Sequence, residues 1–255
     1  MKHTVIKIRK TNAIKHGIGH KNRQRYRVQM KNITLSIPGE TNYYMQEAYK
    51  TLCTNILFCG SDIKTIGLTS YADNEGKSVI TIGIAKSFAE LGRKTLILDA
   101  DMRKSVMAGR NSDAEKPIGL SEVLTGMASF EEAVCSTQQE NLDVLFAGKY
   151  PPNPVELLNS KNFSALLDEL RQVYAQIFID TAPLGRVIDA SVVANKCDGM
   201  VLVIGNPKIH NRELQNTVEQ LKKSDTPILG VVRNFVSDDG KAYYKKYDKY
   251  KAYRA

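Results

Sequence analysis

Short apolar runs rich in β-branched residues alternate with longer segments of helical periodicity through most of this 255-residue chain. The apolar runs, which we predict to be strands, fall at residues 65–69, 95–98, 142–146, 177–179, 200–204 and 228–232. The helical patterns fall at 43–58, 77–91, 120–134 with an interruption, 162–173, 190–195 and 211–223. Apolar strands that are separated by helices are typical of a parallel sheet covered on both faces. The sequence therefore predicts an α/β fold with a predominantly parallel sheet and helices on both faces.

The positive charge of the chain is concentrated at its two ends. Residues 1–31 hold ten Lys or Arg and no acid, and residues 241–255 hold six Lys or Arg against one Asp, within a net charge of +9. With 42% hydrophobic residues, the chain has apolar material for one sizeable core. We therefore expect a flexible basic arm over residues 1–40, a single folded domain over 41–240, and a mobile, tyrosine-rich tail over 241–255.

The two basic ends of the chain would attract partners that carry negative charge. Nucleic acid, an anionic membrane surface and an acidic protein are the candidates, because each is a polyanion, and a solvated arm without any partner is the alternative. No apolar run approaches the roughly 18 residues that a membrane span needs, and the N-terminus is charged where a signal peptide would be apolar. We therefore expect a cytoplasmic protein.

A phosphate-binding loop is predicted directly after the strand at 65–69. Residues 69–78 read Thr-Ser-Tyr-Ala-Asp-Asn-Glu-Gly-Lys-Ser, and a helical pattern follows them. A strand, a turn and a helix that opens with Gly-Lys-Ser is the setting of a P-loop, in which backbone N–H groups and the positive helix end face the phosphates. Lys77 would add a positive charge at the β- and γ-phosphates, Ser78 an oxygen for Mg²⁺, and Gly76 a close approach of the backbone. Tyr71 stands where the usual pattern has its first glycine, so the simple pattern is not met.

Carboxylates end two further apolar strands. Asp99 and Asp101 follow the run Leu-Ile-Leu, and Asp180 follows the run Ile-Phe-Ile. Because the carboxyl ends of parallel strands line one crevice, we expect the three carboxylates to converge on the P-loop, where oxygen ligands suit Mg²⁺ bound to phosphates. The alternative is that each Asp only forms a turn or caps a helix.

These three segments together resemble the Walker A, A′ and B motifs of the bacterial tyrosine kinases. The resemblance extends over residues 43–253 and includes the segment 152–158, Pro-Asn-Pro-Val-Glu-Leu-Leu, before the third motif. Asp73 and Asn74 stand where many relatives have Pro-Gly, which removes no phosphate ligand. A P-loop NTPase-like fold is implied. So is an ATP-dependent protein-tyrosine kinase, which phosphorylates its own C-terminal tyrosines and thereby regulates synthesis and export of a capsular or extracellular polysaccharide.

The resemblance also implies roles for individual residues. Lys77 would bind the β- and γ-phosphates, Ser78, Asp101 and Asp180 would hold Mg²⁺, and Asp99 would accept the proton of the incoming tyrosine. Which of Asp99 and Asp101 is base and which is metal ligand stays open. The residues expected at the nucleotide are Asp73, Asn74, Glu75, Gly76, Lys77, Ser78, Val79 and Asn234, the last at adenine. The expected phosphate acceptors are Tyr243, Tyr244, Tyr247, Tyr250 and Tyr253.

Partners follow from the same resemblance. In Gram-positive relatives the kinase is a separate chain, activated by a membrane-spanning protein of the polysaccharide chain-length or co-polymerase type. A tyrosine phosphatase and an anionic membrane surface are further expected partners, with the kinase cytoplasmic and held at the inner face of the plasma membrane through its activator. Ring assembly stays open: the family's ExxRxxR helix motif reads Glu47-x-x-Lys50-x-x-Cys53 here, and lysine cannot reproduce a bidentate arginine fork.

The competing interpretation is a septum-positioning or plasmid-partition ATPase, which acts as a nucleotide-dependent switch for membrane or DNA binding. These proteins share the fold and the Asp-bearing strand, but their loop carries a lysine at the position of Ala72. Its absence disfavours that interpretation, and with it nucleic acid as a partner.

Overall fold

An eight-stranded sheet forms the centre of this computed structural model, which describes residues 31–35, 37, 42–107, 118–205, 209 and 211–236. The strand order is β1-β4-β5-β3-β6-β2-β7-β8, and each neighbouring pair is parallel except β4 and β5. The strands are β1 (Lys31–Ile33), β2 (Thr65–Ser70), β3 (Thr95–Asp99), β4 (Cys135–Thr137), β5 (Leu142–Leu145), β6 (Gln176–Asp180), β7 (Gly199–Ile204) and β8 (Ile228–Arg233). The prediction of a predominantly parallel α/β sheet is confirmed.

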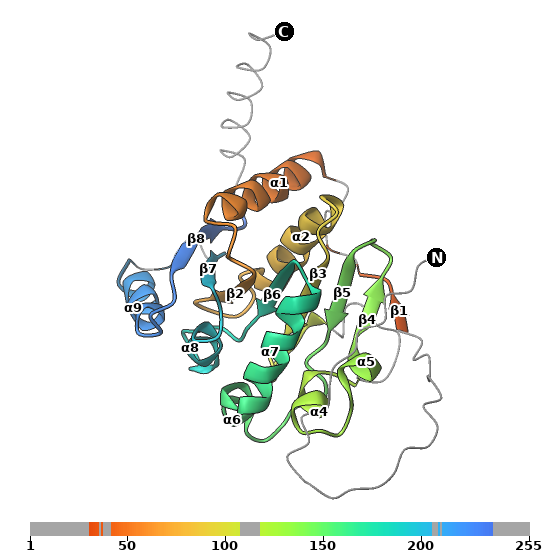
Figure 1. Ribbon diagram of the computed structural model, residues 1–255. Helices are drawn as coiled ribbons and strands as arrows, with labels where there is room; N and C mark the ends of the chain where they lie inside the picture. The colour runs from red at the N-terminus through yellow and green to blue at the C-terminus, as the bar shows by residue number, and fades with distance from the viewer. Residues whose placement is uncertain are drawn as a thin grey trace, which may run out of the picture.

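Helices cover both faces of the sheet (Figure 1). α1 (Tyr43–Phe58) and α2 (Lys77–Glu90) pack on one face, where Ile97 and Phe178 point. The opposite face, which receives Leu96 and Ile177, is covered mainly by α4 to α8. Their bounds, with α9, are α4 (Leu120–Leu124), α5 (Phe130–Ala133), α6 (Pro154–Asn159), α7 (Lys161–Val173), α8 (Asp189–Ala194) and α9 (Asn211–Lys222). Because successive strand residues point to opposite faces, the presence of a hydrophobic core on each face explains why the central strands are apolar throughout.

The expected flexible arm over residues 1–40 is wrong at its C-terminal end. Lys31–Ile33 forms the edge strand β1 beside β4, and Leu35 and Ile37 are buried. The Leu35 backbone exchanges hydrogen bonds with the side chain of Gln138, at 2.7 Å to Oε1 and 2.6 Å from Nε2. Three-residue strands such as β1 and β4 are too short to show a periodic pattern. Residues 1–30 and the tail 241–255 lie outside the described residues.

The segment 152–158, which belongs to the family resemblance, is largely helical. Pro154 occupies the start of α6, where a proline costs no hydrogen bond because the first helical N–H groups have no partner within the helix. Leu158 of α6 is buried with the core under α7.

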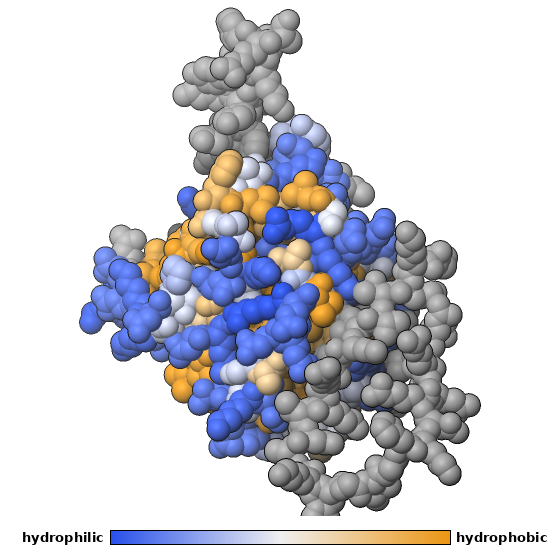
Figure 2. Space-filling view, viewed as in Figure 1, coloured by the Kyte–Doolittle hydropathy of each residue, from blue (hydrophilic) through white to orange (hydrophobic). Residues whose placement is uncertain are grey.

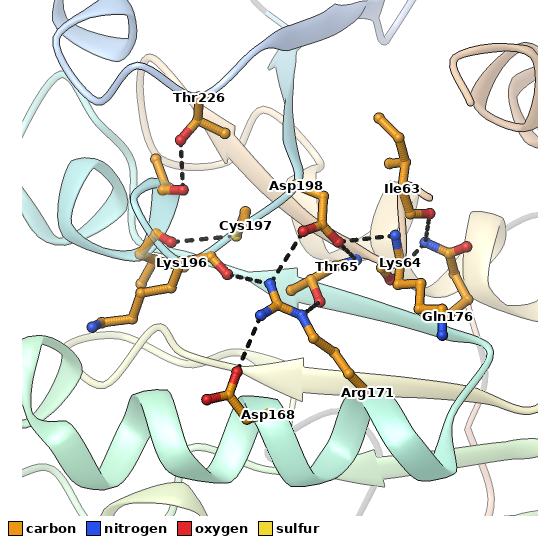
Figure 3. A network of polar contacts seen from close by, with 12 residues as sticks. Ile63, Lys64, Thr65, Asp168, Arg171, Gln176, Lys196, Cys197, Asp198 and Thr226 are labelled. Carbon is orange, nitrogen blue, oxygen red and sulfur yellow. Dashed lines mark hydrogen bonds and ion pairs between the residues drawn. The ribbon is translucent and has the colours of Figure 1, made fainter. Parts of the chain in front are cut away.

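A polar network joins the ends of the central strands that lie opposite the P-loop (Figure 3). Arg171 of α7 donates to Thr65 Oγ1 at 2.9 Å and to the Lys196 carbonyl at 2.8 Å, and pairs with Asp198 at 3.2 Å. Asp198 in turn accepts from the backbone of Lys64 and Thr65 at 2.9 and 2.7 Å. The starts of β2 and β7 are thereby fixed to each other and to α7.

On the surface, hydrophobic residues gather over α1 and β8, whereas α9 is largely hydrophilic (Figure 2). Phe58 of α1, Val231 of β8 and Phe235 just after β8 are among the large hydrophobic side chains that are exposed there. Among the residues that the structure describes, no helix is long and apolar enough to cross a membrane.

Candidate active site

The loop between β2 and α2 has the strand–turn–helix form expected of a P-loop. Gly76 caps α2 at φ 84°, and Asn74 also has a positive φ, of 61°. Glycine adopts this left-handed conformation freely, and asparagine is among the few other residues that tolerate it. A Cβ on Gly76 would also lie 2.0 Å from Nδ2 of Asn234, so this position requires glycine.

Tyr71, at the place of the usual first glycine, points out of the loop. Its hydroxyl donates to Glu213 Oε1 of α9 at 2.9 Å, and its carbonyl accepts from the Gly185 N–H at 3.0 Å. A Cβ on Gly185 would lie 2.3 Å from this carbonyl oxygen. The loop therefore accommodates a large side chain by directing it to α9 and by packing its backbone on a glycine that follows β6.

Glu75 holds the loop together rather than facing a ligand. Its buried carboxylate accepts from the Ala72 N–H at 2.9 Å and from the Gly205 N–H at 3.3 Å. Glu75, one of the residues expected at the nucleotide, therefore stabilises the backbone conformation of the loop. Ser78 and Val79, which are also expected there, lie half-buried at the first turn of α2.

Lys77 and Asp180 form a buried ion pair across the predicted site. Lys77 Nζ lies 2.5 Å from Asp180 Oδ1, and the two side chains are 7% and 2% exposed. Thr81 Oγ1 lies 3.4 Å from the same oxygen. The end of the third motif therefore meets the start of α2, as the sequence predicts.

Asp99 lies beside Asp180 on the neighbouring strand and is fully buried. The Ser105 hydroxyl donates to its Oδ2, and the Asp101 N–H donates to its Oδ1 at 3.1 Å. Burial, and then the charge of Asp180, raise the pKa of Asp99 to about 7. A carboxyl group that titrates near neutral pH is suited to accept a proton in catalysis.

Asp101 is more accessible than Asp99. It is 7% exposed, and its Oδ1 accepts from the Lys104 N–H at 3.0 Å. Burial raises the pKa of this carboxyl also. The structure thus places Asp99, Asp101 and Asp180 around the Lys77 end of the P-loop.

Mg²⁺ suits the oxygens that this site offers. Within the described residues no group of three or more His, Cys, Asp or Glu is arranged to hold a metal ion by itself. Mg²⁺ ordinarily keeps waters and binds through one or two carboxylates together with substrate phosphates. Ser78, Asp101 and Asp180 are the residues that would hold it in that way.

Two cations that sequence reasoning missed lie over the loop. Lys104 Nζ and Arg186 Nη1 approach Asp73 Oδ2 at 3.5 and 3.3 Å, and both cations are largely exposed. They follow β3 and β6, directly after the predicted carboxylates. Arg103, between Asp101 and Lys104, makes a two-point contact with buried Asp189 at 2.8 and 3.0 Å and so fixes this segment to α8.

Tyr150 is a further residue at the mouth of the site that sequence reasoning missed. Its hydroxyl donates to the Ser105 carbonyl at 3.2 Å. Burial, and then the charges of Asp99 and Asp101, raise the pKa of this phenol. In the sequence, Tyr150 is distinguished only by its position close to the Pro-Asn-Pro segment.

Asn234 closes the other side of the loop. Its N–H donates to the Ile204 carbonyl at 2.7 Å, and its amide nitrogen donates to the Glu75 carbonyl at 3.0 Å. The amide nitrogen is thus engaged within the loop, and the amide oxygen is the hydrogen-bond acceptor that this side chain offers. An acceptor suits the amino group of adenine and not the 6-oxygen of guanine.

The expected oligomerisation residues are bound to each other within α1. Lys50 Nζ lies 2.9 Å from Glu47 Oε1, and Cys53, the third position of the motif, is buried in the core. The five tail tyrosines lie outside the described residues.

Comparison with known proteins connects this site to a family. A family model described as an AAA domain matches residues 63–229. Tyrosine-protein kinase CpsD of Streptococcus pneumoniae is 43% identical over 189 residues, which cover 74% of this chain and 83% of that protein. A solved structure of the chimerical protein CapA2B2 has a TM-score of 0.74 and 32% identity, over 81% of this chain and 93% of that chain.

The competing class is more distant. The septum site-determining protein MinD of Pyrococcus horikoshii OT3, solved with Mg-ADP, has a TM-score of 0.54 and 27% identity, over 66% of this chain and 68% of that chain. This similarity confirms the P-loop NTPase-like fold, while the higher identity and coverage belong to the kinase relative. The chain therefore belongs to the bacterial tyrosine kinases.

Proposed function

We propose that the chain transfers the γ-phosphate of Mg·ATP to the tyrosines of its own C-terminal tail, and that this modification regulates synthesis and export of a capsular or extracellular polysaccharide. The observation that carries the proposal is the convergence of Lys77, Asp99 and Asp180 at the N-terminus of α2. Phosphoryl transfer requires positioning and charge neutralisation, and this site offers backbone N–H groups, one lysine and several carboxylates for both.

Binding begins with the loop and Lys77. Backbone N–H groups at the start of α2 and the Lys77 ammonium face the β- and γ-phosphates, so the lysine exchanges part of its contact with Asp180 for phosphate oxygens. Ser78, Asp101 and Asp180 would hold Mg²⁺, and the ion would supply positive charge beside the phosphates. Asn234 orients the adenine through its amide oxygen.

Transfer then joins the tyrosine oxygen to the γ-phosphorus while the bond between this phosphorus and the bridging oxygen breaks, and ADP leaves. A tyrosine with an ordinary pKa near 10 is protonated at neutral pH, so its proton must be accepted. We assign that proton to Asp99, whose raised pKa of about 7 suits the exchange. Asp101, which is more exposed than Asp99, would instead be a ligand of the metal ion.

The acceptors are Tyr243, Tyr244, Tyr247, Tyr250 and Tyr253. Each phosphate adds roughly −1.5 to −2 charges, so a few of them reverse the basic charge of residues 241–255. The tail is in this way both substrate and switch. A membrane-spanning activator holds the kinase at the inner face of the plasma membrane, and a tyrosine phosphatase returns the tail to its basic form.

A mixing experiment tests the transfer. An active variant that lacks residues 241–255 is incubated with Mg·ATP and with a full-length Lys77→Met variant as acceptor, in the presence and absence of the activator's cytoplasmic segment. Phosphotyrosine on the acceptor's tail, found by mass spectrometry, supports transfer between subunits. If ATP is hydrolysed while every tail tyrosine of wild-type protein stays unmodified, the proposal fails and a switch ATPase of the partition type is favoured. An Asp62→Asn variant, at an exposed turn outside the site, is the matched control for substitutions of the aspartates.

A further inference from the structure

The two sides of the P-loop differ in chemistry. β2 leads into the loop and lies between β6 and β7 in the sheet. The carboxylates Asp99, Asp101 and Asp180 all lie on the β6 and β3 side. On the other side, β7 ends at Ile204 and is followed by Gly205, and β8 is followed by Asn234 and Phe235. In the proposed function the carboxylate side receives the terminal phosphate and the metal, so the nucleoside of a bound nucleotide would extend toward the ends of β7 and β8.

Phe235 places an aromatic ring on that side of the loop. A Cβ on Gly205 would lie 2.9 Å from Cδ2 of Phe235, and a Cβ on Gly76 would lie 3.4 Å from its Cζ. The ring therefore rests against two glycines, one at the end of β7 and one at the start of α2. The residue is nevertheless 63% exposed. The glycines allow close contact on one side while much of the side chain stays open to solvent.

The backbone of Phe235 is strained. Its φ is 53°, in the left-handed region that a bulky residue rarely adopts. The preceding residue is fixed on both sides, because the Asn234 N–H binds the Ile204 carbonyl and its amide nitrogen binds the Glu75 carbonyl. Strained residues persist where the surroundings determine them, and they cluster at binding sites. An exposed phenylalanine in a strained conformation gains neither burial nor backbone stability in the free protein.

We propose that Phe235 is the platform on which the purine base of the bound nucleotide stacks. The proposal rests on nucleotide binding by the P-loop and adds a residue to it. The flat face of a purine and an aromatic ring stack irrespective of base identity, so Phe235 supplies affinity while the Asn234 amide supplies selectivity. Asn234 and Phe235 therefore both contact the base, which is present in ATP and absent from inorganic polyphosphate.

Two ligands separate base contacts from phosphate contacts. Calorimetric titrations with Mg·ATP and with magnesium tripolyphosphate are made on the full-length protein and on Phe235→Ala, Phe235→Leu and Phe235→Tyr variants. Phe58→Ala is the matched control, because Phe58 is an even more exposed phenylalanine, 84% exposed, at the end of α1. Thermal melts confirm that each variant is folded.

The expected result is selective. Phe235→Ala weakens the binding of ATP about 10-fold, as loss of base stacking does, and changes the affinity for tripolyphosphate by less than about twofold. Phe235→Leu weakens the binding of ATP nearly as much, Phe235→Tyr binds ATP with an affinity near that of wild type, and Phe58→Ala leaves the affinity unchanged. An equal loss for both ligands in Phe235→Ala would mean that the ring only shapes the loop, and no loss for either would exclude the contact; both results overturn the proposal. Failure of nucleotide binding itself is recognised separately, since wild-type protein would then not bind tripolyphosphate.

Discussion

The Lys77 ammonium lies 2.5 Å from the Asp180 carboxylate, and both side chains are buried beside the first turn of α2. The pair gives Lys77 a partner before phosphate arrives. It also makes Asp180 a competitor of phosphate for the same charge. Removing Asp180 should therefore change stability and phosphate binding in opposite directions.

An Asp180→Asn variant should lose about 3–5 kcal/mol of unfolding free energy, because a buried lysine is left without its counter-ion. The same variant should bind magnesium-free tripolyphosphate about 5-fold more tightly, because phosphate no longer competes with a carboxylate. Denaturant titration and calorimetry measure the two effects, with Asp62→Asn, at an exposed turn outside the site, as control. Weaker binding of magnesium-free tripolyphosphate would show that Asp180 does not compete with phosphate.

The pH dependence of stability should report on Asp99. Its pKa is 3.8 in an unfolded chain and about 7 in the fold, so the fold binds this proton more tightly. The associated stability is complete below the unfolded value and is lost as the pH rises from about 4 to about 7. In the nucleotide-free protein an Asp99→Asn variant should lack this loss, so its melting temperature should exceed that of wild type most clearly at pH 8. Parallel pH profiles for wild type and variant would contradict this. Asp62→Asn should follow wild type throughout.

The cations beside Asp73 should be available to a nucleotide once that aspartate is neutral. In Asp73→Asn, Lys104 and Arg186 lose their carboxylate partner and the loop loses a negative charge near the phosphates. We expect ATP to bind about 3- to 10-fold more tightly at low salt, with a smaller gain at high salt because of screening. Arg186→Gln should have the opposite sign. Equal affinities of Asp73→Asn and wild type at low salt would exclude this electrostatic role.

Arg171 should contribute to the stability of the fold and not to kinase activity. Its guanidinium joins Thr65, Lys196 and Asp198 at the strand ends opposite the P-loop (Figure 3). Arg171→Ala should cost about 2 kcal/mol of unfolding free energy because several partially buried groups lose their donor, and Arg171→Lys should cost less. Urea denaturation measures both. A kinase activity that fell in folded Arg171→Ala protein would indicate that the network also positions the site.

The sequence predicted the central strands well because each is apolar throughout and is buried on both faces. It missed β1 and β4, whose three residues are too few for a pattern. It placed Lys77, Asp99, Asp101 and Asp180 near one another through a topological rule about strand ends. That rule uses order along the chain and needs no side-chain detail.

The residues that escaped prediction act through contacts between distant loops. Tyr150 reaches the Ser105 carbonyl, and Ser105 binds Asp99, across a separation in sequence that no local pattern encodes. Phe235 is one residue beyond the asparagine that the family resemblance marks, yet only its exposure and its contact with Gly205 give it a role. Side-chain partners of this kind are fixed by tertiary packing.

Phosphorylation of the tail is the central claim, and intact-protein and peptide mass spectrometry test it most directly. Wild-type protein, Lys77→Met and a variant with phenylalanine at all five tail tyrosines are incubated with Mg·ATP and the activator segment. The account predicts phosphate on the peptide 241–255 of wild type and none on that peptide in either variant. Wild-type protein that hydrolyses ATP without any phosphotyrosine on this peptide would contradict it.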